Sequence, residues 1–286
     1  MLKYFALVLI LSLVSHLTDT VDMPNQPLSH SAISGAIEPQ FYQQLSDISI
    51  YKSVGSTNDQ LWQRLEQGLN TPAVCLSEHQ TAGRGRRGDS WESPSTGNLY
   101  LSLFWPFPAD TLKNGLSIAI GIGLINTLKK IGINDLKLKW PNDILCKKQK
   151  LSGILVESRF GKQQNVVIGI GLNFKLPIAT RNKIQQPTTS LQQLCKKTPC
   201  RNMLAGHIIQ NMIETITLFQ ARGLQDFLPL WSHYDALHNA KIKLISNEKT
   251  LIAKACGING EGQLLYEYQD QIHALSSSHI SIRFAS

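Results

Sequence analysis

Cysteine is scarce and scattered in this chain of 286 residues. The five cysteines are odd in number and form no C-x-x-C pair, which argues against a disulfide framework and against a four-ligand zinc site. Charged residues make up only 17% of the sequence and hydrophobic residues 42%, a composition that excludes a fibrous or wholly disordered chain. We therefore expect a globular protein of a reducing compartment, the cytoplasm.

The sequence also lacks a hydrophobic run long enough to cross a membrane. Its most apolar stretch, residues 4–14, has about 11 residues, whereas a hydrocarbon core ~30 Å thick needs about 20. Lys3 precedes this stretch as in a secretory signal peptide, but no A-x-A cleavage site follows it. We interpret it as an N-terminal helix followed by a polar linker from Thr18 to Ser34, and expect no membrane association.

Acidic residues are the minority among the charged ones. The chain has 28 Lys and Arg against 20 Asp and Glu, a net charge of +8 that attracts anionic partners without naming them. Nucleic acid, nucleotide and an acidic protein all remain open. No basic cluster is long enough to indicate a disordered tail.

Helical and strand patterns alternate along the chain, and no period of 20 to 50 residues repeats. Strands are expected near residues 48–53, 73–76, 99–105, 136–140, 154–157 and 165–172, and helices from Thr57, along 116–131 and along 202–221. Thr57-x-x-Gln60 has the form of a capping box. After residue 237 the period becomes 2, with short strands near 241–245, 250–258, 263–268, 271–275 and 279–284. We predict an α/β (α+β) fold with a mixed sheet, followed by a small β-barrel.

A long loop without period, residues 81–98, interrupts this pattern and is a functional candidate by its length. It contains Gly83-Arg84-Gly85-Arg86-Arg87-Gly88, which alternates flexible backbone with guanidinium groups and suits an anionic phosphate. It is not a Walker A loop, because no G-K-[ST] follows. A solvated basic surface loop explains the same composition equally well.

Three further patterns are weak when taken singly. Asp143 follows a strand in Trp140-Pro141-Asn142-Asp143, where open sheets hold ligands, but Asn and Asp also favour plain turns. Lys150 opens an apolar strand and is either an anion ligand or an edge lysine. Gly169 and Gly171 lie inside a strand, which indicates close approach of a ligand or of a packed helix.

The order of these motifs is informative. Taken along the chain, the motifs are Ser56-Thr57-Asn58, Gln80, the Arg-rich loop followed by Trp91, Asn98-Leu99-Tyr100-Leu101-Ser102, Lys139 to Asp143, Lys150 to Glu157 and Gly169 to Asn173. Together they resemble the biotin protein ligases over roughly residues 48–286. The resemblance implies ATP-dependent activation of biotin as biotinyl-5′-AMP and transfer to a lysine of a biotin carboxyl carrier domain, as in a biotin--[biotin carboxyl-carrier protein] ligase. It also implies a C-terminal SH3-like barrel and Mg²⁺ with ATP.

The resemblance assigns roles to individual positions. It implies that Lys150, Arg86 and Asp143 are catalytic, with Asp143 orienting Lys150 or the incoming amine or holding the metal, whose ligands stay unassigned. The biotin-binding positions it implies are Ser56, Thr57, Asn58, Gln80, Arg84, Gly85, Arg86, Lys150 and Gly153. The nucleotide-binding positions it implies are Arg84, Arg86, Arg87, Trp91, Asn98, Asn142 and Asn173.

This chain departs from the family pattern in three places, of which the replacement of a common alanine by Ser152 is expected to have no effect. Asp89 stands where many members carry a basic residue, which reduces the charge of the loop. Only 55 residues precede Ser56, so we expect a monofunctional enzyme whose N-terminal segment is at most a degenerate winged helix-turn-helix. The expected division is 1–40 as N-terminal segment, 41–236 as catalytic domain and 237–286 as barrel.

Two other functions stay open from the sequence. One is a lipoate or octanoate ligase of the same superfamily, which normally lacks the Arg-rich loop. The other is a biotin-sensing DNA-binding repressor, which the net charge of +8 would favour. We expect no sequence-specific DNA binding, and a homodimer is compatible with the sequence.

Overall fold

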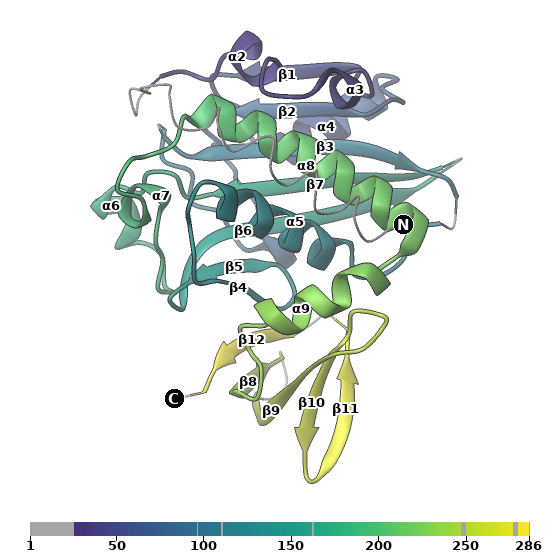
Figure 1. Ribbon diagram of the computed structural model, residues 1–286, viewed down its shortest axis with the longest axis vertical. Helices are drawn as coiled ribbons and strands as arrows, with labels where there is room; N and C mark the ends of the chain where they lie inside the picture. Colours follow the sequence, from purple (N-terminus) through teal and green to yellow (C-terminus); the bar gives the residue numbers. More distant parts are fainter. Residues whose placement is uncertain are drawn as a thin grey trace, which may run out of the picture.

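The computed structural model describes residues 26–95, 97–109, 111–161, 163–246, 250–276 and 280–285, and its main feature is a seven-stranded sheet (Figure 1). The strand order is β1-β2-β3-β7-β6-β5-β4, with β1 and β2 parallel and every other pair antiparallel. The strands are β1 (Asp47–Tyr51), β2 (Ala73–Ser77), β3 (Leu99–Phe107), β4 (Leu136–Lys139), β5 (Asp143–Cys146), β6 (Gln149–Phe160) and β7 (Gln164–Leu172). The expected mixed sheet is confirmed.

Helices cover the two faces of this sheet unequally. The long helices α5 (Leu116–Lys130) and α8 (Arg201–Arg222) pack on one face, and α4 (Thr57–Glu66) packs on the other against β2, β3 and β7 (Figure 1). Alternation along β3 supplies both cores, because Leu103 belongs to the large cluster and Phe104 to the small one under α4. The second face is therefore only partly covered.

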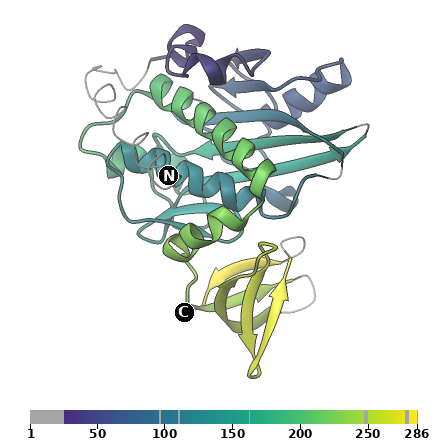
Figure 2. The same cartoon turned by 45° about the vertical axis from the view of Figure 1, so that its right-hand side comes forward.

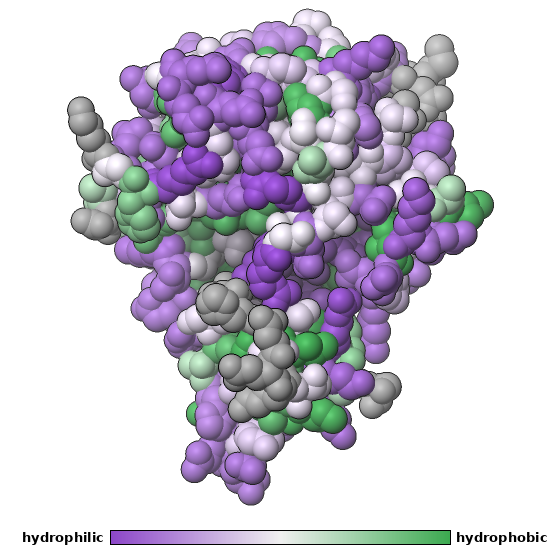
Figure 3. All heavy atoms as spheres, turned by 180° about the vertical axis from the view of Figure 1, so that it is seen from behind, coloured by the Kyte–Doolittle hydropathy of each residue, from purple (hydrophilic) through white to green (hydrophobic). Residues whose placement is uncertain are grey.

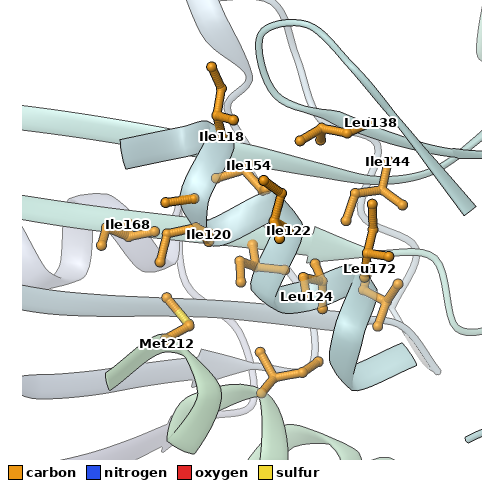
Figure 4. Packing of buried hydrophobic residues seen from close by; sticks show 14 of the residues in the cluster. Ile118, Ile120, Ile122, Leu124, Leu138, Ile144, Ile154, Ile168, Leu172 and Met212 are labelled. Atoms are coloured by element: carbon orange, nitrogen blue, oxygen red, sulfur yellow. The ribbon is translucent and has the colours of Figure 1, made fainter. Parts of the chain in front are cut away.

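The large core explains why α5 is apolar nearly all round. Ile118, Ile120 and Ile122 of α5 pack between the sheet and Met212 of α8, with Ile168 of β7 opposite (Figure 4). A helix buried between a sheet and a second helix has no solvent face to keep polar. The buried helix expected along 116–131 is confirmed.

The C-terminal strands form a second, five-stranded antiparallel sheet beside the first (Figure 2). Its order is β11-β10-β9-β8-β12, and its strands are β8 (Lys241–Ile245), β9 (Thr250–Ile258), β10 (Leu264–Tyr268), β11 (Gln271–Leu275) and β12 (Ser281–Phe284). It is joined to the large sheet by the Trp140 indole, whose Nε1–H donates to the Gly262 carbonyl at 2.9 Å. This contact fixes the small sheet next to the W-P-N-D turn.

Short helical segments complete the chain. They are α2 (His30–Ser34), α3 (Pro39–Tyr42), α6 (Ile178–Arg181), α7 (Leu191–Leu194) and α9 (Leu228–Tyr234), with single 3-10 turns η1 (Arg86–Gly88) and η2 (Gln225–Phe227). None of the helices within the described residues is long and apolar enough to span a membrane.

Three sequence-based expectations were wrong. The N-cap of α4 is Ser56 and it makes no side-chain capping bond, so Thr57 and Gln60 form no capping box. Strand β5 was missed, because the turn signal of Trp140 to Asp143 hid a strand of four residues. The polar linker expected up to Ser34 contains α2, whose N-cap Ser29 accepts from the Ala32 N–H.

The described part of the N-terminal segment is packed on the large core. Leu28, Ile33 and Ile37 belong to that core, and Gly206 of α8 leaves room for the α2 backbone. Arg201 donates to the Gln26 carbonyl and to Glu78, which in turn accepts from the Leu28 N–H. Residues from 26 onward are thus tied to the sheet, while the signal-like stretch 4–14 lies outside the described residues.

Candidate functional site

A pocket of about 470 Å³ lies on the partly covered face of the large sheet. Figure 3 views this side of the molecule and shows hydrophilic side chains gathered around its hollow middle. The pocket is bounded by the sheet, by the Arg-rich loop and by residues 280–283 of the small sheet. It brings together these predicted residues: Ser56, Thr57, Asn58, Gln80, Arg84, Gly85, Arg86, Arg87, Trp91, Asn142, Asp143, Lys150, Gly153 and Asn173.

One end of the pocket is a neutral hydrogen-bonded network. Gln80 Oε1 accepts from the Thr57 backbone N–H at 2.8 Å and from the Thr57 hydroxyl at 3.1 Å. Ser102 Oγ on β3 lies 2.7 Å from Thr57 Oγ1 and 2.6 Å from Asn58 Oδ1. Asn58 Nδ2 donates to Glu157 at 2.8 Å. Because these buried side chains are hydrogen-bonded to one another, each is held in one orientation.

The first turn of α4 explains why these residues face the pocket. Thr57 and Asn58 are buried against β3, and an added Cβ at Gly169 of β7 would collide with Asn58 Oδ1. Gly169 is therefore needed for the close approach of this amide to the sheet. Ser102 was not predicted as a site residue, although it ends the motif Asn98-Leu99-Tyr100-Leu101-Ser102.

Two glycines of the large sheet form the middle of the pocket floor, which we call the glycine floor. Gly153 of β6 and Gly171 of β7 are register partners, and the Trp91 indole lies directly over both. A Cβ would lie 2.8 Å from Trp91 Cζ3 at Gly153 and 2.5 Å from Trp91 Cε2 at Gly171. The buried Trp91 Nε1–H has no acceptor among the described residues. Of the two predicted strand glycines, Gly171 is therefore explained by the aromatic ring and Gly169 by the packing of helix α4.

The other end of the pocket is rich in cations around one carboxylate. Lys150 Nζ lies 2.7 Å from Asp143 Oδ1, and Lys139 Nζ lies 3.7 Å from Asp143 Oδ2. Lys150 Nζ is also 5.2 Å from the centre of the Trp91 ring. Burial, together with the charges of Lys150 and Arg283, lowers the pKa of Lys139.

A β-bulge determines that Lys150 faces this end. Asp143 pairs with Gly153 and Ile144 with Ser152, but Leu145 pairs with Lys150 because the register shifts by one residue. Pairing without the shift would place Leu151 opposite Leu145 and turn Lys150 to the other face of the sheet. The bulge thus converts a strand-edge lysine into a pocket residue.

The three arginines of the loop have different surroundings. The Arg84 guanidinium is bound by the carboxylates of Asp59 and Glu157. Burial and the neighbouring charge of Arg87 lower the pKa of Arg86. Arg87 has a left-handed backbone with φ of 58° at the tip of the loop, in η1.

The three asparagines predicted to bind the nucleotide bind the protein backbone instead. Asn142 Nδ2 donates to the Ile154 carbonyl at 2.8 Å, and Asn173 Nδ2 donates to the Thr189 carbonyl at 3.2 Å. Asn98 is fully buried, and its Oδ1 accepts from the backbone N–H of Phe174 and of Lys175 at 2.9 Å. Asn98 does not line the pocket, so its observed contacts hold the chain behind the site.

Three cationic residues of the pocket were not predicted: Lys139, Lys183 and Arg283. Lys139 is part of the K-W-P-N-D motif. Because β5 was not predicted, the pairing of Lys139 with Asp143 between β4 and β5 was not predicted either. Arg283 comes from β12 of the small sheet, at the far end of the chain. The motif could have identified Lys139, whereas no local signal identifies Arg283.

Comparison with known proteins gives consistent results. Residues 50–173 match the model of the biotin/lipoate A/B protein ligase family. The chain is 36% identical over 244 residues to the bifunctional ligase/repressor BirA of Salmonella typhimurium, covering 84% of this chain and 75% of that one. It is 33% identical over 172 residues to a biotin--[acetyl-CoA-carboxylase] ligase of Mycobacterium tuberculosis, covering 58% and 62%.

A solved structure has the same fold. The biotin protein ligase of Aquifex aeolicus in complex with biotin and ATP superposes with a TM-score of 0.72 at 24% identity, covering 84% of this chain and all of that one.

Proposed function

The chain belongs to the biotin/lipoate A/B protein ligase family, and we propose that it is a biotin protein ligase whose two half-reactions take place in the pocket described above. It joins biotin to ATP with release of pyrophosphate, and it then passes the biotinyl group to a protein lysine. The observation that supports this most strongly is the pairing, in one pocket, of a neutral hydrogen-bonded end with a cation-rich end. The uncharged ring system of biotin needs the first environment, and the phosphates of a nucleoside triphosphate need the second.

The neutral end receives the ring system of biotin in this proposal. A ureido group both donates and accepts hydrogen bonds, and Thr57, Asn58 and Gln80 offer hydroxyl and amide groups of both kinds. The network behind them holds these groups in place before the ligand arrives. Such preorganisation lowers the entropy cost of binding a small uncharged ring.

The cation-rich end receives the reacting groups. The biotin carboxylate must approach the α-phosphate although both are anionic, and each cation facing the gap reduces that repulsion. Lys150 is the ammonium nearest the junction between the glycine floor and Asp143, and we assign it to the carboxylate and the α-phosphate. Arg86, Arg87 and Lys139 would stabilise the charge of the departing pyrophosphate.

The second half-reaction needs no nucleophile from the enzyme. The acyl-phosphate bond of the adenylate is already activated, so the amine of the acceptor lysine attacks it and AMP leaves. Asp143 is the carboxylate at this end of the pocket that is bound to Lys150 and Lys139, and we propose that it orients Lys150 and the incoming amine. The acceptor we propose is a biotin carboxyl carrier domain.

Magnesium is a further part of the proposal. The described residues hold no group of three or more His, Cys, Asp or Glu side chains that would make a protein metal site. This fits Mg²⁺, which is usually bound by one or two carboxylates together with substrate phosphates and water. Asp143 would be its protein ligand, and the ion would offset charge on the phosphates.

We also propose a cytoplasmic location, from the cysteine usage of the sequence, and no sequence-specific DNA binding. The described N-terminal helices α2 and α3 have five and four residues, and α2 packs on α8 and β1. Affinity for DNA should therefore be weak and should fall steeply with salt, as for non-specific phosphate contacts. A nanomolar complex with one DNA sequence at physiological salt would contradict this.

The activity is tested by exchange of labelled pyrophosphate into ATP. We expect exchange that requires biotin, with lipoate and octanoate giving none above background. Exchange supported by lipoate or octanoate instead of biotin would favour the lipoate-type alternative. Transfer is then checked by mass spectrometry of a carrier domain, which should gain one biotinyl group.

A further inference from the structure

Arg84 differs from the other two arginines of its loop, although the sequence presents all three alike. Its guanidinium makes four contacts with two carboxylates: Nε and Nη2 with Asp59 at 3.2 and 2.6 Å, and Nη1 and Nη2 with Glu157 at 2.7 and 3.0 Å. The guanidinium carries five N–H donors in total. Four contacts leave little capacity for a phosphate.

The charge around Arg84 also disfavours an anion. One guanidinium faces two carboxylates, so the group of three carries a net charge of −1. The Arg84 side chain is 36% exposed, and a simple ion pair at such exposure contributes little. Bidentate geometry and a shared network are the exceptions to that rule, and both are present here.

Glu157 connects Arg84 to the neutral end of the pocket. Its Oε2 accepts from Arg84, from Asn58 Nδ2 at 2.8 Å and from Trp62 Nε1 at 3.2 Å. The orientation of the Asn58 amide therefore depends on a carboxylate that Arg84 also holds in place. Arg84 joins three elements that are distant in sequence: its own loop, helix α4 through Asp59, and strand β6 through Glu157.

The loop beyond Arg84 closes on itself through backbone contacts. Arg84 pairs with Ser90 as an isolated antiparallel bridge, and the Gly85 N–H donates to the Asp89 carbonyl at 2.6 Å. Between them lie Gly88 with φ of 81° and the 3-10 turn η1. Glycines on both sides of the Arg86 and Arg87 pair allow this tip to change its backbone direction.

We propose that Arg84 is a positioning residue rather than a phosphate ligand. It fixes the base of the loop and, through Glu157, the Asn58 amide that faces biotin, so that this base keeps its place when ligands bind. The part of this inference that concerns biotin rests on the proposed function. The part that concerns the loop does not, because it describes the protein without ligands.

Limited digestion with trypsin, read out peptide by peptide by mass spectrometry, tests the loop. Trypsin must draw an arginine side chain into its acidic specificity pocket, and Arg84 has to leave two carboxylates to do so. In the ligand-free protein we expect cuts after Arg87, which is exposed at the tip of the loop, to be at least about tenfold faster than cuts after Arg84. In the double variant Asp59→Asn, Glu157→Gln, cutting after Arg84 should rise to within about threefold of cutting after Arg87.

The digestion has three outcomes that would overturn the proposal. These are equal cutting after Arg84 and Arg87 in the unaltered protein, no change after Arg84 in the double variant, and no cutting after Arg87. The matched control is Glu66→Gln, which removes a carboxylate at the exposed end of the same helix, where Glu66 pairs with Arg159. It should leave the cutting pattern unchanged, and thermal melting checks that each variant is folded.

Pyrophosphate exchange tests the link to biotin. Glu157→Gln keeps the shape of the side chain but removes its charge, and we expect the KM for biotin to rise about tenfold while the KM for ATP stays within about twofold. Arg84→Gln should give the same split, and Arg84→Lys should restore part of the loss. A raised KM for ATP in Arg84→Gln that Glu157→Gln does not reproduce would show that Arg84 binds the nucleotide.

The two tests fail separately. If no exchange occurs with biotin in the unaltered protein, the proposed function is wrong, and the digestion still decides whether Arg84 fixes the loop.

Discussion

The two ends of the pocket solve different problems of recognition. At the neutral end, Thr57, Asn58, Gln80 and Ser102 bind one another, so their orientations are settled before a ligand arrives. At the charged end, Asp143 pairs with both Lys139 and Lys150, and Arg283 lies nearby, so that like charges are held together. The first arrangement stabilises the empty protein, whereas the second is stabilised by an anionic ligand. In one pocket, therefore, the side chains at one end are already oriented for a ligand, whereas the positive charges at the other end repel one another until an anion binds.

The largest effect is expected from Lys150→Gln at the charged end. The substitution keeps a stem and a hydrogen-bond donor but removes the positive charge. Because repulsion between carboxylate and α-phosphate is greatest as they meet in the transition state, kcat for adenylation should fall by about 10² to 10³. Single-turnover formation of the adenylate measures it.

Two further results sharpen this prediction. Lys150→Arg should restore only part of the rate, since a planar fork does not replace a compact ammonium. Thermal melting of Lys150→Gln should stay close to that of the unaltered protein. If Lys150→Gln formed the adenylate at the rate of the unaltered protein, Arg86 or Lys139 would be the cation that reduces the repulsion between carboxylate and α-phosphate.

A smaller loss is expected where the two ends join, at Gly171→Ala. The new Cβ would stand 2.5 Å from Trp91, so the indole must leave the glycine floor. We expect adenylation to fall about tenfold and the protein to lose roughly 1 to 3 kcal/mol of stability, as for other overpacked sites.

Gly161→Ala is the matched control for this substitution. Gly161 lies in the turn between β6 and β7, where a Cβ meets only a carbonyl at 3.7 Å. The change should alter neither adenylation nor melting. If Gly171→Ala behaves like this control, the ring is free to shift and the glycine floor has no role in the reaction.

The neutral end should respond in binding rather than in rate. Ser102→Ala removes a fully buried hydroxyl that supports Thr57 and Asn58. We expect the KM for biotin to rise about fivefold with kcat nearly unchanged, and a stability loss of about 1 kcal/mol, because the groups left behind lose a buried partner. A fall in kcat with unchanged KM would break the contrast between the two ends.

Much of the fold could be predicted because its signals are local. The helices α5 and α8, the strands around them and the hairpin-rich C-terminal sheet each follow from a period of 3.6 or 2. The candidate residues could be listed from motifs, and most of them line one pocket. The missed β5 shows the limit, since four residues after a turn signal carry no clear period.

The rest depends on pairing across the chain. The bulge that turns Lys150 toward Asp143 is a one-residue register shift between β5 and β6, and no pattern in the sequence of either strand predicts it. Arg283 enters the pocket from the second sheet, over a hundred residues after Lys150. The separation of Arg84 from Arg86 and Arg87 comes from Asp59 and Glu157, which lie on other elements. Such contacts are decided by tertiary structure and not by composition.

The smallest effect concerns Glu157, the carboxylate that binds Asn58 at the neutral end. Burial alone would raise the pKa of this carboxyl, but hydrogen bonds from Arg84, Asn58 and Trp62 outweigh it and hold the pKa below its ordinary value. A carboxyl whose pKa is lower in the folded protein adds stability that is fully present above its ordinary pKa of about 4.3 and is lost as the pH falls through the folded value. We therefore expect Glu157→Gln to reduce the free energy of unfolding by about 1 kcal/mol at pH 7, and this difference to shrink in acid.

Urea denaturation of both proteins between pH 7 and about pH 3 measures the difference directly. Glu66→Gln, at the exposed Arg159 pair, serves as the control and should differ from the unaltered protein by only a few tenths of a kcal/mol. A Glu157→Gln difference that stays constant with pH would mean that the carboxylate contributes only its shape. The neutral end would then need no charge behind it, and the contrast between the two ends of the pocket would be complete.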